Sequence, residues 1–123
     1  MRDRGKWMPF WRKALPLLVA VCAVSLPAAA ADRFFMYNLT TAATFTGVFL
    51  APAGTEQWGS NQALNDKDHE IDPSERLSIK DIGRGLFDVK LIDRKGRVCI
   101  VHNVDLRKDT TFETQDRDLK DCH

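Results

Sequence analysis

The chain has few residues of the types that most often carry enzyme chemistry. Its 123 residues include three cysteines, three histidines and one tyrosine. It has no Gly-x-Ser-x-Gly elbow, no phosphate-binding loop, no Gly-x-Gly-x-x-Gly after a strand pattern and no His-Glu-x-x-His. These absences argue against the common hydrolase, nucleotide-binding and zinc-protease classes. We therefore expect no catalytic residues and no cofactor.

Long apolar runs are also scarce, and the one that stands out lies near the N-terminus. It covers residues 14–26, follows a basic segment, and is followed by Pro27 and four alanines, residues 28–31. A basic start, a short apolar run and small residues at the end are typical of a cleaved signal peptide. The alternative is an uncleaved membrane anchor, which needs about 20 apolar residues. We expect a signal peptide over residues 1–31 and a periplasmic or secreted protein without membrane contact after cleavage.

Without the expected signal segment, the chain has no excess of positive charge. Residues 32–123 keep 13 of the 18 Lys and Arg residues but 16 of the 17 Asp and Glu residues, which gives a formal charge of −3. A negative balance excludes the electrostatic attraction on which nucleic-acid and anionic-lipid binding depend. These 92 residues suffice for one domain. We expect a monomer that binds an unknown envelope protein or a small ligand.

The residues from Gly85 to Leu106 show the pattern of a β-hairpin. Apolar and polar side chains alternate from Phe87 to Leu91, as in a strand with one buried face. Residues 93–96, Asp-Arg-Lys-Gly, fit a type I turn closed by a glycine bulge. The chain then returns through residues 97–101, which are rich in β-branched side chains.

Four further segments have strand character, and together with the hairpin they predict an all-β fold. They are residues 33–38, 45–51, 75–82 and 110–114. Gly47 is expected at a bulge or close approach, and Pro52 ends its strand because proline donates no backbone hydrogen bond. We expect a small antiparallel sandwich or barrel-like domain of about six strands over residues 32–123.

The longest segment without strand character, residues 52–73, contains the only tryptophan outside the signal segment, Trp58. Long loops in small domains are often functional. One interpretation, which we favour, makes Trp58 a plug over one end of the core. The other makes Trp58 and the adjacent Gly59 an aromatic platform for a ligand, and under either the loop is the expected contact surface.

The same loop has acidic residues at alternate positions, which resembles the start of a calcium-binding EF-hand loop. They are Asp66, Asp68 and Glu70, with His69 between them. The pattern then fails, because Ile71 stands where that loop needs glycine and Leu77 where it needs glutamate. We favour a solvated acidic loop. The alternative is a metal site or a small metal-dependent hydrolase that uses these residues.

Two cysteines, Cys99 and Cys122, remain outside the signal segment. Export delivers thiols to an oxidising compartment, where they tend to pair. The alternation along residues 98–104 places Val98, Ile100 and Val104 in the core, which turns Cys99 to the opposite face, where a returning tail could lie. We expect a Cys99–Cys122 disulfide; the alternative is two unrelated thiols.

Several short motifs together resemble a family of small, mostly uncharacterised exported bacterial proteins. They are Asn38 and Thr40, Phe49-Leu50-Ala51-Pro52, Trp58-Gly59, Pro73-Ser74, Leu86-Phe87-Asp88-Val89-Lys90 and Val104-Asp105-Leu106. The resemblance implies a β-sandwich or barrel-like domain in the cell envelope and implies no reaction. Many such proteins carry cysteines where this chain has Gly85 and Arg107. Any disulfide here must therefore be connected differently.

Overall fold

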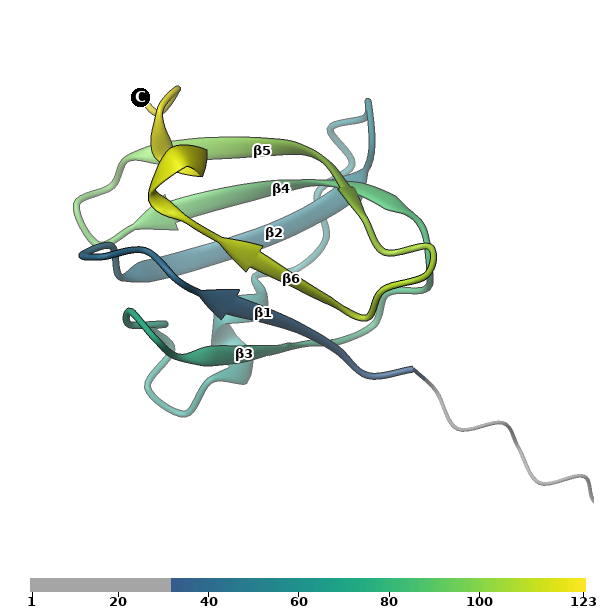
Figure 1. The fold of residues 1–123 in the computed structure, drawn as a ribbon, viewed down its shortest axis with the longest axis horizontal. Helices are drawn as coiled ribbons and strands as arrows, with labels where there is room; N and C mark the ends of the chain where they lie inside the picture. The colour runs from purple at the N-terminus through teal and green to yellow at the C-terminus, as the bar shows by residue number, and fades with distance from the viewer. Residues whose placement is uncertain (1–31) are drawn as a thin grey trace, which may run out of the picture. The chain divides into compact units, whose positions relative to one another are not determined.

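Within residues 32–123, six strands form two three-stranded sheets (Figure 1). The structure is a computed structural model that describes residues 32–123, so the expected signal segment lies outside the described residues. The elements are β1 (Phe34–Asn38), β2 (Phe45–Pro52), η1 (Gln62–Asn65), β3 (Arg76–Ile79), β4 (Leu86–Asp93), β5 (Val98–Asp105), β6 (Thr111–Thr114) and η2 (Asp116–Leu119), where η marks a short 3-10 helix. The expected all-β domain is confirmed. Neither helix within residues 32–123 is long and apolar enough to cross a membrane.

Each sheet has one central strand. In the first sheet β1 pairs antiparallel with β3 and parallel with β6. In the second sheet β4 pairs antiparallel with β2 and with β5. The parallel β1–β6 pair departs from the wholly antiparallel arrangement that we expected. The two strands are joined through the entire second sheet rather than by a hairpin, so their relative direction is not constrained by a tight turn.

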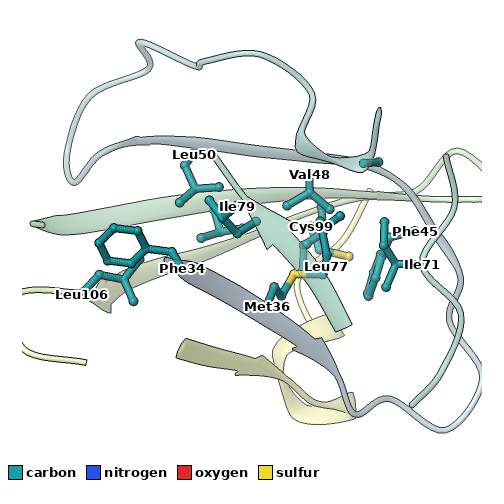
Figure 2. Close-up of a cluster of buried hydrophobic side chains, with 13 residues drawn as sticks. Phe34, Met36, Phe45, Val48, Leu50, Ile71, Leu77, Ile79, Cys99 and Leu106 are labelled. Atoms are coloured by element: carbon teal, nitrogen blue, oxygen red, sulfur yellow. The ribbon is translucent and has the colours of Figure 1, made fainter. Parts of the chain in front are cut away.

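Apolar side chains from both sheets meet between them and form the core (Figure 2). The first sheet contributes Phe34, Met36, Leu77 and Ile79, and the second contributes Phe45, Val48, Leu50, Val89, Leu91 and Cys99. Ile71 and Leu106 join this core from outside the strands. Truncating a core side chain of this size typically costs about 2–5 kcal/mol.

The hairpin turn between β4 and β5 has the expected geometry. Gly96 has φ of +87°, and its amide donates to the carbonyl oxygen of Asp93 over 2.9 Å. The Asp93 carboxylate accepts from the amides of Lys95 and Arg97, both at 2.9 Å, and from Arg97 Nε at 2.7 Å. These bonds set the hairpin register, in which Leu91 faces Cys99.

This register overturns the expected orientation of β5. Because Leu91 points into the core, its partner Cys99 does so too and is 2% exposed. Val98 and Ile100 therefore point to the outer face of the sheet and stay half-buried. Val104 does contact the core, because an extra residue in β5 restores the inward direction before it.

The long connection between β2 and β3 covers the outer edges of both strands. Asn61 accepts from the Val48 amide and donates to the Thr46 carbonyl, and the Gly59 amide donates to the Leu50 carbonyl, each at 3.0 Å. Gln62 bonds both the amide and the carbonyl of Lys80 at the end of β3. Unpaired strand edges are templates for unwanted pairing, and this loop protects two of them.

Candidate binding site on the outer face of the β2-β4-β5 sheet

Three side chains form a row across the outer face of the second sheet. Phe49 of β2 pairs with Lys90 of β4, and Lys90 pairs with Ile100 of β5. All three are half-buried. Their chain neighbours Leu50, Val89 and Leu91 point into the core, so the row necessarily points away from it.

The loop after β2 places Trp58 over this row. The Thr55 amide and hydroxyl donate to the Pro52 carbonyl, at 3.0 and 2.7 Å, and the Gly59 amide then joins the loop to Leu50. Between these two anchors the Trp58 ring lies near the Lys90 ammonium, 4.9 Å from nitrogen to ring centroid. The same ammonium lies 5.0 Å from the Phe49 ring centroid.

The favoured interpretation of Trp58 as a core plug is wrong. Trp58 is half-buried and does not belong to the core cluster. The interior is already filled by Phe45, Leu50, Ile71 and their neighbours. Because Gly59 is bonded along the β2 edge, the preceding indole packs on the outside of the sheet.

A groove with a volume of about 340 Å³ lies between this loop and β5. Its lining residues are Gly54, Thr55, Glu56, Trp58, Asp88, Ile100, His102 and Asn103. The volume is at the lower end of the range of small-ligand sites and would also hold one or two side chains of a protein partner. An indole and an aliphatic side chain supply its apolar wall, and a carboxylate and an imidazole supply polar groups.

Asp88 is a fixed anion in the groove wall. It lies on the outer face, as the alternation predicts, but it is 4% exposed because the loop and a bulge in β5 cover it. Its carboxylate accepts from the Gly54 amide at 3.0 Å and from the Asn103 amide at 3.1 Å. Asn103 holds a left-handed backbone, φ of +59°, which asparagine tolerates better than most residues.

The hydrogen bond from Gly54 is the main cause of a lowered pKa of the Asp88 carboxyl. Burial opposes this effect, and the bonds from Asn103 and His102 reinforce it. His102 Nδ1 lies 3.3 Å from the carboxylate, while the imidazole remains 68% exposed. Asp88 is therefore ionised at neutral pH and holds the loop, the bulge and the groove wall together.

The side chains of the acidic loop do not converge on a common centre. Within residues 32–123 no group of three His, Cys, Asp or Glu side chains is arranged to hold a metal ion. Asp66 accepts from the Asp68 amide at 2.9 Å, and Glu70 binds the Arg94 guanidinium at 2.6 Å. Their oxygens point to local partners rather than to a common centre, as in a solvated acidic loop.

The Cys99–Cys122 disulfide is present, with 4.2 Å between the Cα atoms. It joins β5 to the C-terminal tail, although from the core face of β5 rather than from the outer face that we expected. A disulfide sulfur is neither a nucleophile nor a soft metal ligand in this state. The described residues therefore offer no cysteine for catalysis.

Two other hollows are less suited to a ligand. One of about 280 Å³ lies beside the hairpin turn, where Arg94 and Arg97 are already paired with Glu70 and Asp93. A larger one, about 720 Å³, lies over β1 and β3 and reaches Asp32, where the described residues begin. Exposed charged side chains form much of its rim, without a fixed polar group like Asp88.

No protein-family model matches this chain, and neither a curated protein nor a solved structure matches it significantly. The resemblance to exported bacterial proteins therefore stays a prediction. Its motif residues nonetheless have defined places in the structure. Asn38 Nδ2 donates to the carbonyls of Ala43 and Ile71, and its Oδ1 accepts from the amide and hydroxyl of Thr40. The Ser74 amide donates to the Asn38 carbonyl.

The sequence singles out Trp58 but not its neighbours Lys90, Ile100 and His102. The expected core position of Ile100 is wrong, because both faces of residues 98–101 are apolar and the alternation there is ambiguous. The sequence around Lys90 does carry a signal. A lysine flanked by apolar residues marks the outward face of a strand, and aromatic residues beside it can hold its ammonium.

Proposed function

We propose that this protein is an exported, non-catalytic binding module of the cell envelope. Its contact surface is the outer face of the β2-β4-β5 sheet around Trp58. The observation that carries the proposal is a set of half-buried apolar side chains on this face, beside a groove with a fixed carboxylate. The partner is an envelope protein, or a small ligand, that places an apolar group against Trp58 and Ile100.

The composition of this face supports binding. Five large side chains of the surface are apolar and half-buried: Phe49, Trp58, Ile92, Val98 and Ile100. Apolar side chains gathered on one face mark interaction sites more often than scattered ones do. Tryptophan is also one of the residues that contribute most to binding energy at interfaces.

Export is supported by the disulfide and by the signal-like pattern over residues 1–31. Disulfides persist in oxidising compartments such as the periplasm and the extracellular space. The competing function, a metal-dependent hydrolase that uses Asp66, Asp68, Glu70 and His69, has no geometry in its favour.

The experiment is capture of partners from envelope extract by the tagged protein, compared with two variants. Trp58→Ala removes the indole from the proposed surface. Tyr37→Ala is the matched control, because Tyr37 is a half-buried aromatic residue of β1 in the other sheet. We expect a partner that the wild type and Tyr37→Ala retain and that Trp58→Ala loses.

Three outcomes contradict the proposal. One is a partner retained equally by Trp58→Ala, and another is a partner lost only from Tyr37→Ala. The third is turnover of a substrate by the purified protein. Tryptophan fluorescence gives an independent readout, because Trp58 is the only tryptophan of residues 32–123 and its emission should shift when the partner binds.

A further inference from the structure

The backbone of β5 has a free edge whose direction follows from two hydrogen bonds. The Val98 amide donates to the His123 carbonyl at 2.6 Å, and the His123 amide donates to the Val98 carbonyl at 3.0 Å. The polar backbone groups of Val98 therefore point away from β4. Because these groups alternate along an antiparallel strand, Ile100 points the same way, whereas Cys99 and Val101 bond to β4.

The C-terminal tail covers only the start of this edge. Cys122 forms an isolated bridge opposite Cys99, and the disulfide locks the two together. Before the bridge the chain forms η2, in which Gln115 and Asp118 bond each other and the Asp116 carboxylate accepts from the Thr41 amide at 2.9 Å. Leu119 packs against the core. The antiparallel bridge places the Ile100 backbone opposite Asp121, the residue before Cys122.

We propose that the tail masks a self-complementary strand edge, and that reduction of the Cys99–Cys122 disulfide frees β5 to pair with β5 of a second copy of this chain. A dithiol attacks the sulfur of Cys122, the less buried residue of the pair. The Cys99–Cys122 bond breaks, both sulfurs become thiols, and the dithiol becomes a disulfide. Two electrons and two protons pass from the reductant to the protein. The pairing uses the backbone edge of β5, whereas the Trp58 groove uses side chains; Ile100 and His102 belong to both.

A second copy of the chain fits this edge because the backbone groups of β5 that point away from β4 are placed symmetrically about Ile100. With two β5 strands antiparallel and Ile100 at the centre, Ile100 faces Ile100 of the second copy and Val98 faces its His102. Both pairs lie on the outer face, so two apolar rows join into one continuous surface. Residues 98–101 have no charged side chain to oppose such pairing, and β-branched residues favour it.

The edges of β2 and β3 are not free to pair with a strand of a second copy. Asn61, Gly59, Gln62 and Asn65 already occupy backbone groups along them. A two-fold β5–β5 contact uses the same patch on both subunits and closes after two copies. The expected product is therefore a dimer rather than an open fibre.

The experiment measures the mass of the protein, as recovered from its producing cells, by light scattering with and without a dithiol. We expect the oxidised protein to be a monomer and the reduced protein to double in mass as concentration rises. A Cys99→Ala, Cys122→Ala double variant should dimerise without the dithiol. Release of the tail is followed by tryptic cleavage at Arg117 and Lys120, which should accelerate on reduction.

Two variants at one position separate strand pairing from other association. Ile100→Pro removes an amide that points away from β4, so the intramolecular ladder keeps its bonds while the second copy loses a donor. Ile100→Val keeps the amide and a β-branched apolar side chain. We expect the reduced Ile100→Pro variant to be a monomer and the reduced Ile100→Val variant to be a dimer.

Amide hydrogen exchange distinguishes release of the tail from loosening of the whole fold on reduction. On reduction and dilution the Val98 amide should lose protection, whereas the Cys99 and Val101 amides should keep it. Loss of protection throughout the sheet would overturn the proposal, because the disulfide would then hold the fold rather than mask an edge. A reduced protein that releases its tail and stays monomeric, or an Ile100→Pro variant that still dimerises, would overturn it too.

Discussion

The Lys90 ammonium lies between two aromatic rings, 4.9 Å from the Trp58 centroid and 5.0 Å from the Phe49 centroid. Phe49 comes from a strand, whereas Trp58 comes from a loop, so the Lys90 ammonium joins the loop to the sheet. Such an arrangement contributes about 0.5–1 kcal/mol for each exposed cation–π pair. It holds the indole over the sheet and leaves the groove beside it open.

The first prediction concerns this pair. Trp58→Ala should lower the free energy of unfolding by about 1–2 kcal/mol, because a half-buried side chain loses only part of its burial energy and one cation–π contact. Phe45→Ala, a fully buried control, should cost about 3–5 kcal/mol. A double-mutant cycle of Trp58→Ala with Lys90→Met should give a coupling of about 0.5–1 kcal/mol. Denaturant unfolding measures all three, and a loss for Trp58→Ala equal to that for Phe45→Ala would restore the plug.

The second prediction concerns Asn38, which is completely buried and makes four side-chain hydrogen bonds. Asn38→Ala should cost about 2–4 kcal/mol, because the carbonyls of Ala43 and Ile71 lose their donor in a dry site. The control is Asn65→Ala, since Asn65 is half-buried and its two bonds can be replaced by water. Equal effects of the two variants in thermal or denaturant unfolding would contradict this reading.

The third prediction concerns pH. The pKa of Asp88 is lowered from 3.8, chiefly by the Gly54 amide, so the folded state binds this proton more weakly than the unfolded state does. Its stabilisation is therefore fully present above about pH 4 and is lost as the pH falls through the folded pKa. Asp88→Asn should lower the free energy of unfolding by about 1.5–3 kcal/mol at pH 7, because the bonds to two amides lose their charge.

The same variant provides the test of that pH dependence. The stability difference between wild type and Asp88→Asn should shrink when unfolding is measured at progressively lower pH. The pKa of Asp93 is lowered as well, so Asp93 makes stability depend on pH in the same direction in the wild type and in Asp88→Asn. Burial by itself raises the pKa of Asp93, but the hydrogen bonds from Arg97 and Lys95 outweigh it. A difference that stays constant between pH 7 and pH 2 would show that Asp88 does not act through its charge.

The fourth prediction concerns the disulfide. Cys99 and Cys122 close a loop whose ends are 23 positions apart, which on the chain-entropy model stabilises the fold by about 3 kcal/mol. Oxidised and reduced wild type should differ by this amount in denaturant unfolding. Thiol titration of the denatured, unreduced protein, followed by peptide mass mapping, should find neither cysteine free. Free thiols at both positions would contradict the pairing.

The fifth prediction concerns export. The basic start, the apolar run and the alanines predict a mature N-terminus at Ala31 or Asp32. Intact-mass measurement of protein from the periplasmic or culture fraction checks it. Leu18→Arg, a charge within the apolar run, should cause the uncleaved precursor to accumulate inside the cell. Wild-type protein found only in membranes at full-length mass would show an anchor instead.

Local patterns predicted the hairpin and the number of strands correctly. The turn at residues 93–96 needs only an aspartate that bonds the amides following it and a glycine that accepts positive φ, and both are present. The disulfide was predictable for a similar reason, since Cys99 and Cys122 are the only cysteines outside the signal segment. Of the two residues that the sequence singles out for binding, Trp58 lines the groove and Gly59 does not, and a binding role for either stays a prediction.

The positions of the strands and the turn between β4 and β5 follow from the local sequence, because they depend on contacts between near neighbours. The buried face of β5 follows from long-range packing, since residues 98–101 are apolar on both faces and register with Leu91 selects Cys99. Long-range packing also decides that Trp58 lies on Lys90 and that β6 runs parallel to β1. Each of these depends on residues far apart in the chain, whose pairing is set by the packing of two sheets and leaves no periodic pattern in the sequence.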